Sequence, residues 1–152
     1  MNLFNCSGFK WLGIVLLVAL MMPAAAKAQD LKRAQQILND YSHENAVCSA
    51  YYLFVMKCLK NKNPNISLVG AYERASREFL HRSLVAGKAS GVSDAAMEGR
   101  ISLEIDAQRT ATENNCSNIA VLNLKQVETC KALYNHGPDK LEADMNGAGL
   151  KQ

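Results

Sequence analysis

The chain has 152 residues, a formal net charge of +3, and 17 basic against 14 acidic side chains. Nucleic-acid binding depends mainly on clustered Lys and Arg, and the sequence contains no long basic run, so nucleic acid is not expected as a partner. The composition, with three prolines and abundant Ala, Leu, Lys, Glu and Gln, favours helix over strand.

Residues 1–28 have the three parts of an export signal. Lys10 supplies a positive charge, WLGIVLLVALMM an apolar core, and residues 26–28 (AKA) a small-x-small cleavage site. An uncleaved membrane anchor is the alternative, but only about 12 to 16 residues separate Lys10 from Lys27, whereas a spanning helix needs roughly 20. We therefore expect a cleaved signal peptide and no stable membrane insertion after cleavage.

The mature chain would begin at Gln29 and contain 124 residues, enough for one domain with a single core. Loss of Lys10 and Lys27 lowers its net charge to +1, with 15 basic and 14 acidic side chains. Cys6 leaves with the signal peptide, so four cysteines remain in the mature chain. The mature chain has no polybasic segment that would attract it to a membrane surface.

The first mature segment, residues 30–61, carries apolar positions three and four residues apart, as one buried helical face requires. The pattern is compatible with one long helix, or with a second helix that starts at Ser42, whose side chain can cap a helix start. Residues 61–64 (NKNP) end the helix, because proline disfavours helical geometry at the residue before it. The densest apolar run lies within this segment, over residues 45–60.

Three more helices follow in the sequence. The second starts near Ser67 and ends at Gly87 or Gly91, and its charged face is expected to be solvated. The third has Ser93 as its N-cap and runs to residues 114–115 (NN). The fourth starts at Ser117 or Asn118 and is expected to end at residues 136–138 (HGP), because glycine adopts left-handed geometry easily and proline cannot continue a helix.

These segments predict an all-α fold, an up-down antiparallel four-helix bundle with a possible fifth N-terminal helix. The helical domain is expected to cover residues 29–138. The C-terminal tail, residues 139–152, has few apolar side chains and is expected to be disordered.

The four remaining cysteines are expected to form two disulfides, because an exported protein meets an oxidising compartment. Cys48 and Cys58 in one helix would be about 15 Å apart, too far for a disulfide, and Cys116 and Cys130 fail for the same reason. If the first helix lies antiparallel to the last, then Cys48 meets Cys130 and Cys58 meets Cys116. The crossed pairing would require parallel helices.

The sequence offers little support for catalysis. None of the histidines His43, His81 and His136 lies in a nucleophile or metal motif, so we expect no catalytic residues, no metal and no cofactor. Tyr51 and Tyr52 are adjacent and point about 100° apart on a helix, so they are not expected to be central in the core together. One of these two tyrosines is predicted to be available for binding.

The sequence therefore predicts a small periplasmic or secreted, disulfide-braced helical protein that acts by binding, with another exported protein as the expected partner. One form of this is a periplasmic inhibitor or immunity-type protein, which should expose an apolar or aromatic patch. The alternatives are a small-ligand carrier, which should have an internal cavity, and a small hydrolytic enzyme, the least favoured. The oligomeric state is left open.

Overall fold

The computed structural model describes the backbone of residues 9–62 and 66–150, and the burial of side chains over 26–62 and 68–150. The regular structure in these ranges is all helical and comprises α1 (Phe9–Lys62), α2 (Ile66–Ala89), α3 (Asp94–Ala111), the 3-10 helix η1 (Cys116–Asn118) and α4 (Ala120–Gly147). The predicted all-α class with four α-helices is therefore confirmed.

The chain divides into two compact units, Met1–Arg33 and Ala34–Gln152. α1 belongs to both units and runs without a break past the predicted cleavage site at Ala28. Residues 1–8 of the predicted signal peptide lie outside the described residues, and its removal stays a prediction. No helix within the described part of the chain is long and apolar enough to cross a membrane.

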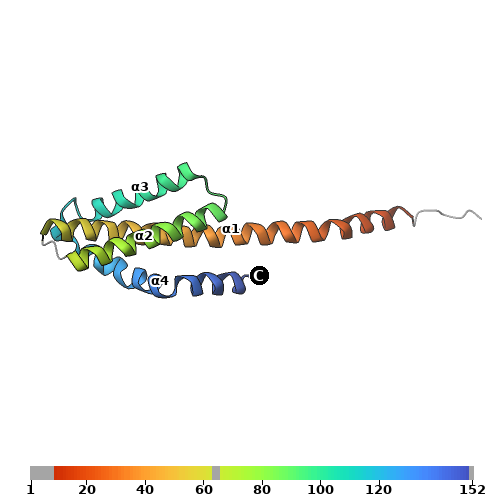
Figure 1. The fold of residues 1–152 in the computed structure, drawn as a ribbon. Helices are drawn as coiled ribbons and strands as arrows, with labels where there is room; N and C mark the ends of the chain where they lie inside the picture. The colour runs from red at the N-terminus through yellow and green to blue at the C-terminus, as the bar shows by residue number, and fades with distance from the viewer. Residues whose placement is uncertain (1–8, 63–65, 151–152) are drawn as a thin grey trace, which may run out of the picture. The chain divides into compact units, whose positions relative to one another are not determined.

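Residues 34–62 of α1 form the centre of the second unit. Residues 30–61 belong to one helix, so neither a break at Ser42 nor a separate fifth helix forms. α3 and α4 lie on opposite sides of α1 (Figure 1). α3 is joined to α1 by Arg100, which donates to Asn39 Oδ1 at 2.7 Å. With α2 as the third neighbour, α1 is covered on three sides.

Four serines bring α1 and α2 together. Ser42 and Ser49 lie seven residues apart on α1, and Ser83 and Ser76 lie seven apart on α2, so each pair faces the other helix. Ser49 Oγ donates to Ser76 O at 2.9 Å, and Ser76 Oγ donates back to Ser49 O at 3.0 Å. Ser42 Oγ donates to Ser83 O at 2.8 Å. These small side chains allow a close helix contact, and the hydroxyls of Ser42, Ser49 and Ser76 donate to carbonyls of the opposite helix.

The turn between α2 and α3 follows local sequence signals. Gly91 has φ +87°, and the N–H of Val92 donates to the carbonyl of Gly87 at 3.0 Å, as in a glycine-terminated helix end. α3 then begins at Asp94 with the predicted N-cap, because Ser93 Oγ accepts from the N–H of Ala96 at 3.3 Å.

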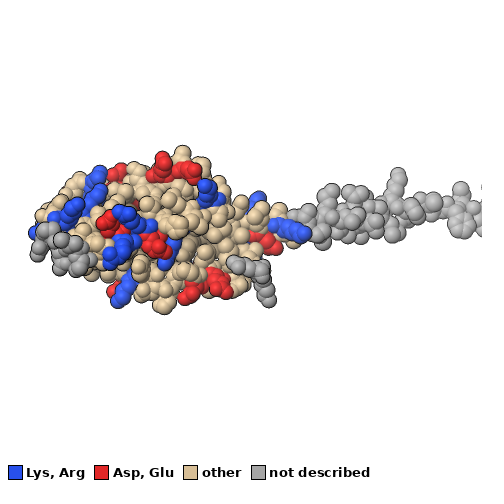
Figure 2. Space-filling model, viewed as in Figure 1, with Lys and Arg blue, Asp and Glu red and all other residues tan. Residues whose placement is uncertain are grey.

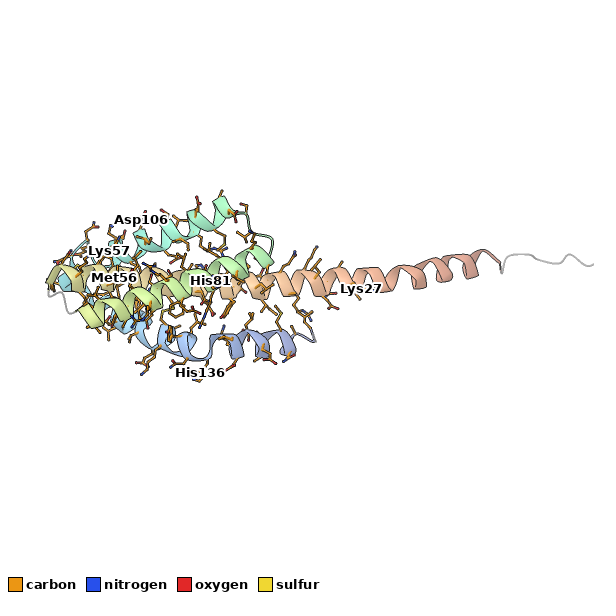
Figure 3. All side chains as sticks on the ribbon, in the orientation of Figure 1. Lys27, Met56, Lys57, His81, Asp106 and His136 are labelled. Atoms are coloured by element: carbon orange, nitrogen blue, oxygen red, sulfur yellow. A yellow bond between two sulfur atoms is a disulfide. The ribbon has the colours of Figure 1, made fainter. Side chains whose placement is uncertain are left out.

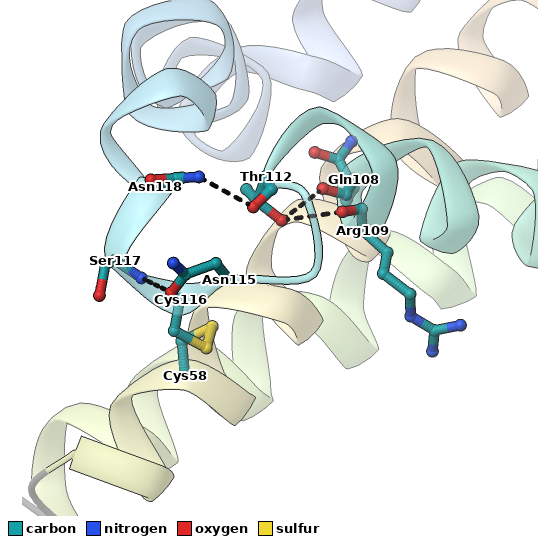
Figure 4. The surroundings of a disulfide bond; sticks show 8 residues. All are labelled: Cys58, Gln108, Arg109, Thr112, Asn115, Cys116, Ser117 and Asn118. Carbon is teal, nitrogen blue, oxygen red and sulfur yellow. Dashed lines mark hydrogen bonds between the residues drawn. A yellow bond between two sulfur atoms is a disulfide. The ribbon is translucent and has the colours of Figure 1, made fainter.

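Two disulfides join α4 and its preceding turn to α1. Cys48 pairs with Cys130 and Cys58 with Cys116, with Cα–Cα distances of 5.4 and 5.3 Å. This is the pairing that antiparallel helices predict. At the Cys116 end, Asn115 Oδ1 accepts from the N–H of Ser117 at 2.9 Å, beside the disulfide (Figure 4). Each bridge closes a long loop and contributes about 4 kcal/mol in the chain-entropy model.

The expected end of the last helix at residues 136–138 is wrong, because α4 continues through Pro138 to Gly147. Proline lacks the N–H that would bond to the carbonyl of Tyr134. Arg82 of α2 substitutes for it, because Nη1 donates to Tyr134 O at 3.3 Å and to Leu133 O at 3.2 Å. Gly137 leaves room for this approach, since a Cβ at that position would lie 3.2 Å from Arg82 Nη1.

The expectation of a disordered tail from residue 139 is likewise wrong as far as Gly147. Lys140 in this part of α4 bonds to both carboxylate oxygens of Glu44 in α1, at 3.0 and 2.9 Å. Burial acts to lower the pKa of Lys140, but the hydrogen bond and charge of Glu44, with Asp144, outweigh it and raise the pKa. Leu141 packs against the core. Contacts made only in the folded protein therefore hold a segment whose composition suggested disorder.

We expect Ser42→Val to destabilise the fold by about 1–3 kcal/mol, because it adds volume at a fully packed contact and removes a buried hydroxyl. Ser42 is 0 % exposed, donates to Ser83 O and accepts from Arg100 Nη1 at 3.0 Å. Urea denaturation measures the change. Ser102→Val, at an exposed position of α3, is the control. Equal stability of the two variants would contradict a stabilising role of Ser42 in the contact between α1 and α2.

Arg82→Gln should lower the free energy of unfolding by about 1.5–3 kcal/mol, because charge-assisted bonds to two carbonyls of α4 are lost. Arg77→Gln is the matched control, since both arginines pair with a glutamate four residues earlier but Arg77 is exposed. The control should cost under about 1 kcal/mol. Hydrogen exchange should show faster opening of 139–147 only in Arg82→Gln. Equal exchange in the two variants would show that Arg82 does not hold the segment after Pro138.

Candidate functional site

The two predicted binding residues, Tyr51 and Tyr52, lie in one aromatic cluster of the core. Tyr51 is 1 % exposed, and its hydroxyl donates to Asn123 Oδ1 of α4 at 2.9 Å. Tyr52 is half-buried and stacks on Phe79, with ring centroids 5.5 Å apart. The expectation that the two tyrosines are not central in the core together agrees with the structure, because Tyr51 belongs to the buried core whereas Tyr52 is a partly buried side chain packed against it. Tyr51 is therefore not accessible to a partner, and Tyr52 is accessible only in part.

The three histidines lie on three different helices, His43 on α1, His81 on α2 and His136 on α4. Figure 3 labels His81 and His136. His43 Nδ1 lies 3.6 Å from Oε1 of the half-buried Glu104, and His136 Nδ1 lies 3.8 Å from Asp139 Oδ2. Both histidines are exposed. Within the described residues, no group of three His, Cys, Asp or Glu side chains could hold a metal ion. The histidines therefore do not converge on one centre.

Two surface hollows meet at Val85 of α2, and we call them together the Val85 surface. The first hollow, of about 210 Å³, lies between α1, α2 and the second half of α4, and its lining includes Leu38, Tyr41, Arg82, Val85, Ala86 and Leu141. The second, of about 380 Å³, lies between α2 and α3 and is lined by Leu84, Val85, Lys88, Asp94 and Glu98. Val85 lines both hollows, so the two hollows adjoin at this residue.

Helical spacing explains why α2 presents this surface. Phe79, Ser83 and Ala86 are three or four residues apart and are buried against the other helices. Leu84 and Val85 fall outside that stripe and are 41 % and 55 % exposed. Two large aliphatic side chains therefore stand next to each other in solvent, beside the hollows.

Charges of both signs border the Val85 surface. Arg82 borders the first hollow, where Glu78 Oε1 accepts from its Nε at 2.8 Å and the α4 carbonyls accept from its Nη1. Lys88, Asp94 and Glu98 border the second hollow. Acidic and basic side chains also alternate over the face of the molecule seen in Figure 2, with uncharged side chains between them. The electrostatics of the surface suit a partner that itself carries both charges.

Compared with protein-family models, with curated proteins and with solved structures, the chain matches none of them. Its function is therefore inferred from its own geometry.

Sequence reasoning missed Arg82 and Val85 as surface determinants. Arg82 lies on the charged face of the second helix, which the sequence predicts to be solvated, because nothing in the local sequence shows that a proline 56 residues later leaves a carbonyl for Arg82. A signal for Val85 did exist, because residues 84–86 (LVA) are three consecutive apolar residues, more than one buried stripe can accommodate.

Burial raises the pKa of the Tyr51 phenol to about 12, with Tyr72 and Tyr52 adding to the effect. Between pH 10.0, the ordinary pKa of a tyrosine, and about pH 12, the Tyr51 phenol ionises in the unfolded chain but stays protonated in the folded chain. Stability should therefore be undiminished below pH 10 and fall as the pH rises through this window. Denaturation against pH measures this fall, which should be shallower in Tyr51→Phe. An unchanged slope in that variant would contradict the prediction.

Proposed function

We propose that this protein is an exported, disulfide-braced helical protein that binds another exported protein through the Val85 surface. Export is supported by the sequence of residues 1–28 and by two disulfides, which form and persist in oxidising compartments such as the periplasm or the extracellular space. The partner is thus expected in that same compartment, and inhibition of that partner is one form the activity could take.

The observation that carries the proposal is the pair of hollows that share Val85. Protein interfaces draw most of their affinity from a few apolar side chains that fill pockets, surrounded by a polar rim. The hollows of about 210 and 380 Å³ supply two adjacent pockets. The first has a mainly apolar lining, and the second combines the aliphatic side chains of Leu84 and Val85 with charged ones. The partner that fits is a segment with two neighbouring aliphatic or aromatic side chains, flanked by charges of both signs.

The scaffold around this surface is rigid. Arg82 is bonded to Glu78 and to two carbonyls of α4, and the turn after α2 is closed by backbone hydrogen bonds. A surface that is already ordered loses little conformational entropy on binding. The disulfide-braced bundle therefore favours recognition through a preformed surface.

Site-specific photo-crosslinking in cells that export the full chain tests the proposal. A photoreactive residue at position 85 should capture one defined protein, and the same residue at Leu124, which is 90 % exposed on α4, should not. In purified form, Val85→Asp should weaken binding of that protein at least about tenfold, because a charge is placed in an apolar contact. Leu124→Asp should leave it unchanged.

Identical crosslinks from positions 85 and 124, or equal affinity of the two aspartate variants, would contradict the proposed surface. A crosslink to a second copy of the chain would show that the Val85 surface is a dimer contact instead.

A further inference from the structure

A third hollow lies between α1, α2 and α3 and shares no lining residue with the two hollows of the Val85 surface. It has a volume of about 260 Å³. Its apolar lining comes from all three helices and includes Ala50, Leu53, Met56, Leu80, Ile101 and Ile105. None of these residues lines either hollow at Val85.

The space exists because α3 covers the α1–α2 pair incompletely. Ser49 and Ser76 hold α1 and α2 close together at this level and form part of the wall. α3 has only Met97 and Gln108 fully buried, one near each end of the helix. Between them Ile101 and Ile105 are only half-buried and line the cavity. The middle of α3 therefore bridges the space without filling it.

The cavity lining has few free hydrogen-bonding groups for a water molecule. A buried water needs two to four polar partners, roughly. The hydroxyls of Ser49 and Ser76 already donate to the carbonyls of the opposite helix, at 2.9 and 3.0 Å. At the cavity's edge Glu73 and Arg77 form an ion pair with each other. The chemistry of the lining selects an uncharged, apolar occupant.

We propose that this cavity binds a small uncharged apolar molecule, a single aromatic ring or a short alkyl chain. An engineered apolar cavity of roughly 150 Å³ binds benzene, so 260 Å³ is sufficient for such a ligand and small for most drug-sized ones. Met56 suits a variable ligand because its thioether side chain is flexible and polarisable. The proposal is independent of protein binding at Val85.

Toluene titration of the full-length exported protein, followed by NMR of the methionine methyl groups, tests this site. Met56 lines the cavity, whereas Met97 is buried away from it, against Ser42 and the Gly87 position. The Met56 methyl signal should shift saturably, and the Met97 signal should stay in place. Sodium hexanoate at the same concentrations should not shift Met56, because its charge is not accommodated.

Ile105→Phe should fill the cavity and weaken toluene binding at least about tenfold, because the added ring takes the ligand's volume. Leu103→Phe is the matched control on the same helix, at a position that is 70 % exposed and outside this cavity, and should bind as the native chain does. Ile101→Phe repeats the test if Ile105→Phe does not fold.

The proposal is overturned if toluene leaves Met56 unshifted, if it shifts Met56 and Met97 alike, or if a folded cavity-filling variant binds toluene as tightly as the native chain. Charged hexanoate binding as well as toluene would overturn the assignment of an uncharged ligand.

Discussion

Two covalent links between the first and last helices constrain the whole second unit. Cys48–Cys130 and Cys58–Cys116 join α1 to α4 and to the turn before it, ten residues apart on α1. Two points of attachment fix both direction and register, so α4 must run antiparallel along α1 beyond Cys130. That path brings Gly137 to within contact of Tyr41 and Arg82, and Lys140 to Glu44. The segment after Pro138 is ordered because the bridges deliver it to these partners.

α2 and α3 pack against α1 to different extents. α2 is held by buried serine–carbonyl bonds, which are reciprocal between Ser49 and Ser76. α3 is held at its ends by Met97 and Gln108 and leaves a space of about 260 Å³ under its middle. Local opening is drawn from regions with few buried apolar contacts. Of the helices in this unit, α3 therefore has the fewest fully buried side chains to hold it in place.

Arg82 links the fold to the surface proposed for partner binding. Its guanidinium satisfies the carbonyls of Leu133 and Tyr134 near Pro138 and lies about 6 Å from the ring centres of Phe79 and Tyr134. The same side chain lines the hollow that contains Val85 and Leu141. A residue that stabilises the end of α4 thus also shapes the adjacent apolar hollow. Fold stability and surface shape are coupled at this point.

Much of the architecture was determined by the sequence alone. The helix periods, the Ser93 cap and the break near Asn114 are local signals, and local backbone chemistry decides them. The disulfide pairing also followed from the sequence, because helix rise and antiparallel direction leave one set of distances short enough. These features depend on spacing along the chain, which the sequence states directly.

Only the tertiary structure decided the remainder. By local propensity Pro138 should end the helix. α4 continues past it because Arg82 donates to the Tyr134 carbonyl, which the proline leaves unpaired. Tyr51 is buried in the core and Tyr52 packs against it because α1 is covered on three sides, and the serine bonds between α1 and α2 depend on the two helices meeting in one register. The cavity under α3 and the Val85 surface arise where side chains from three helices meet. Each of these features depends on residues distant in the chain, so local propensity could not specify them.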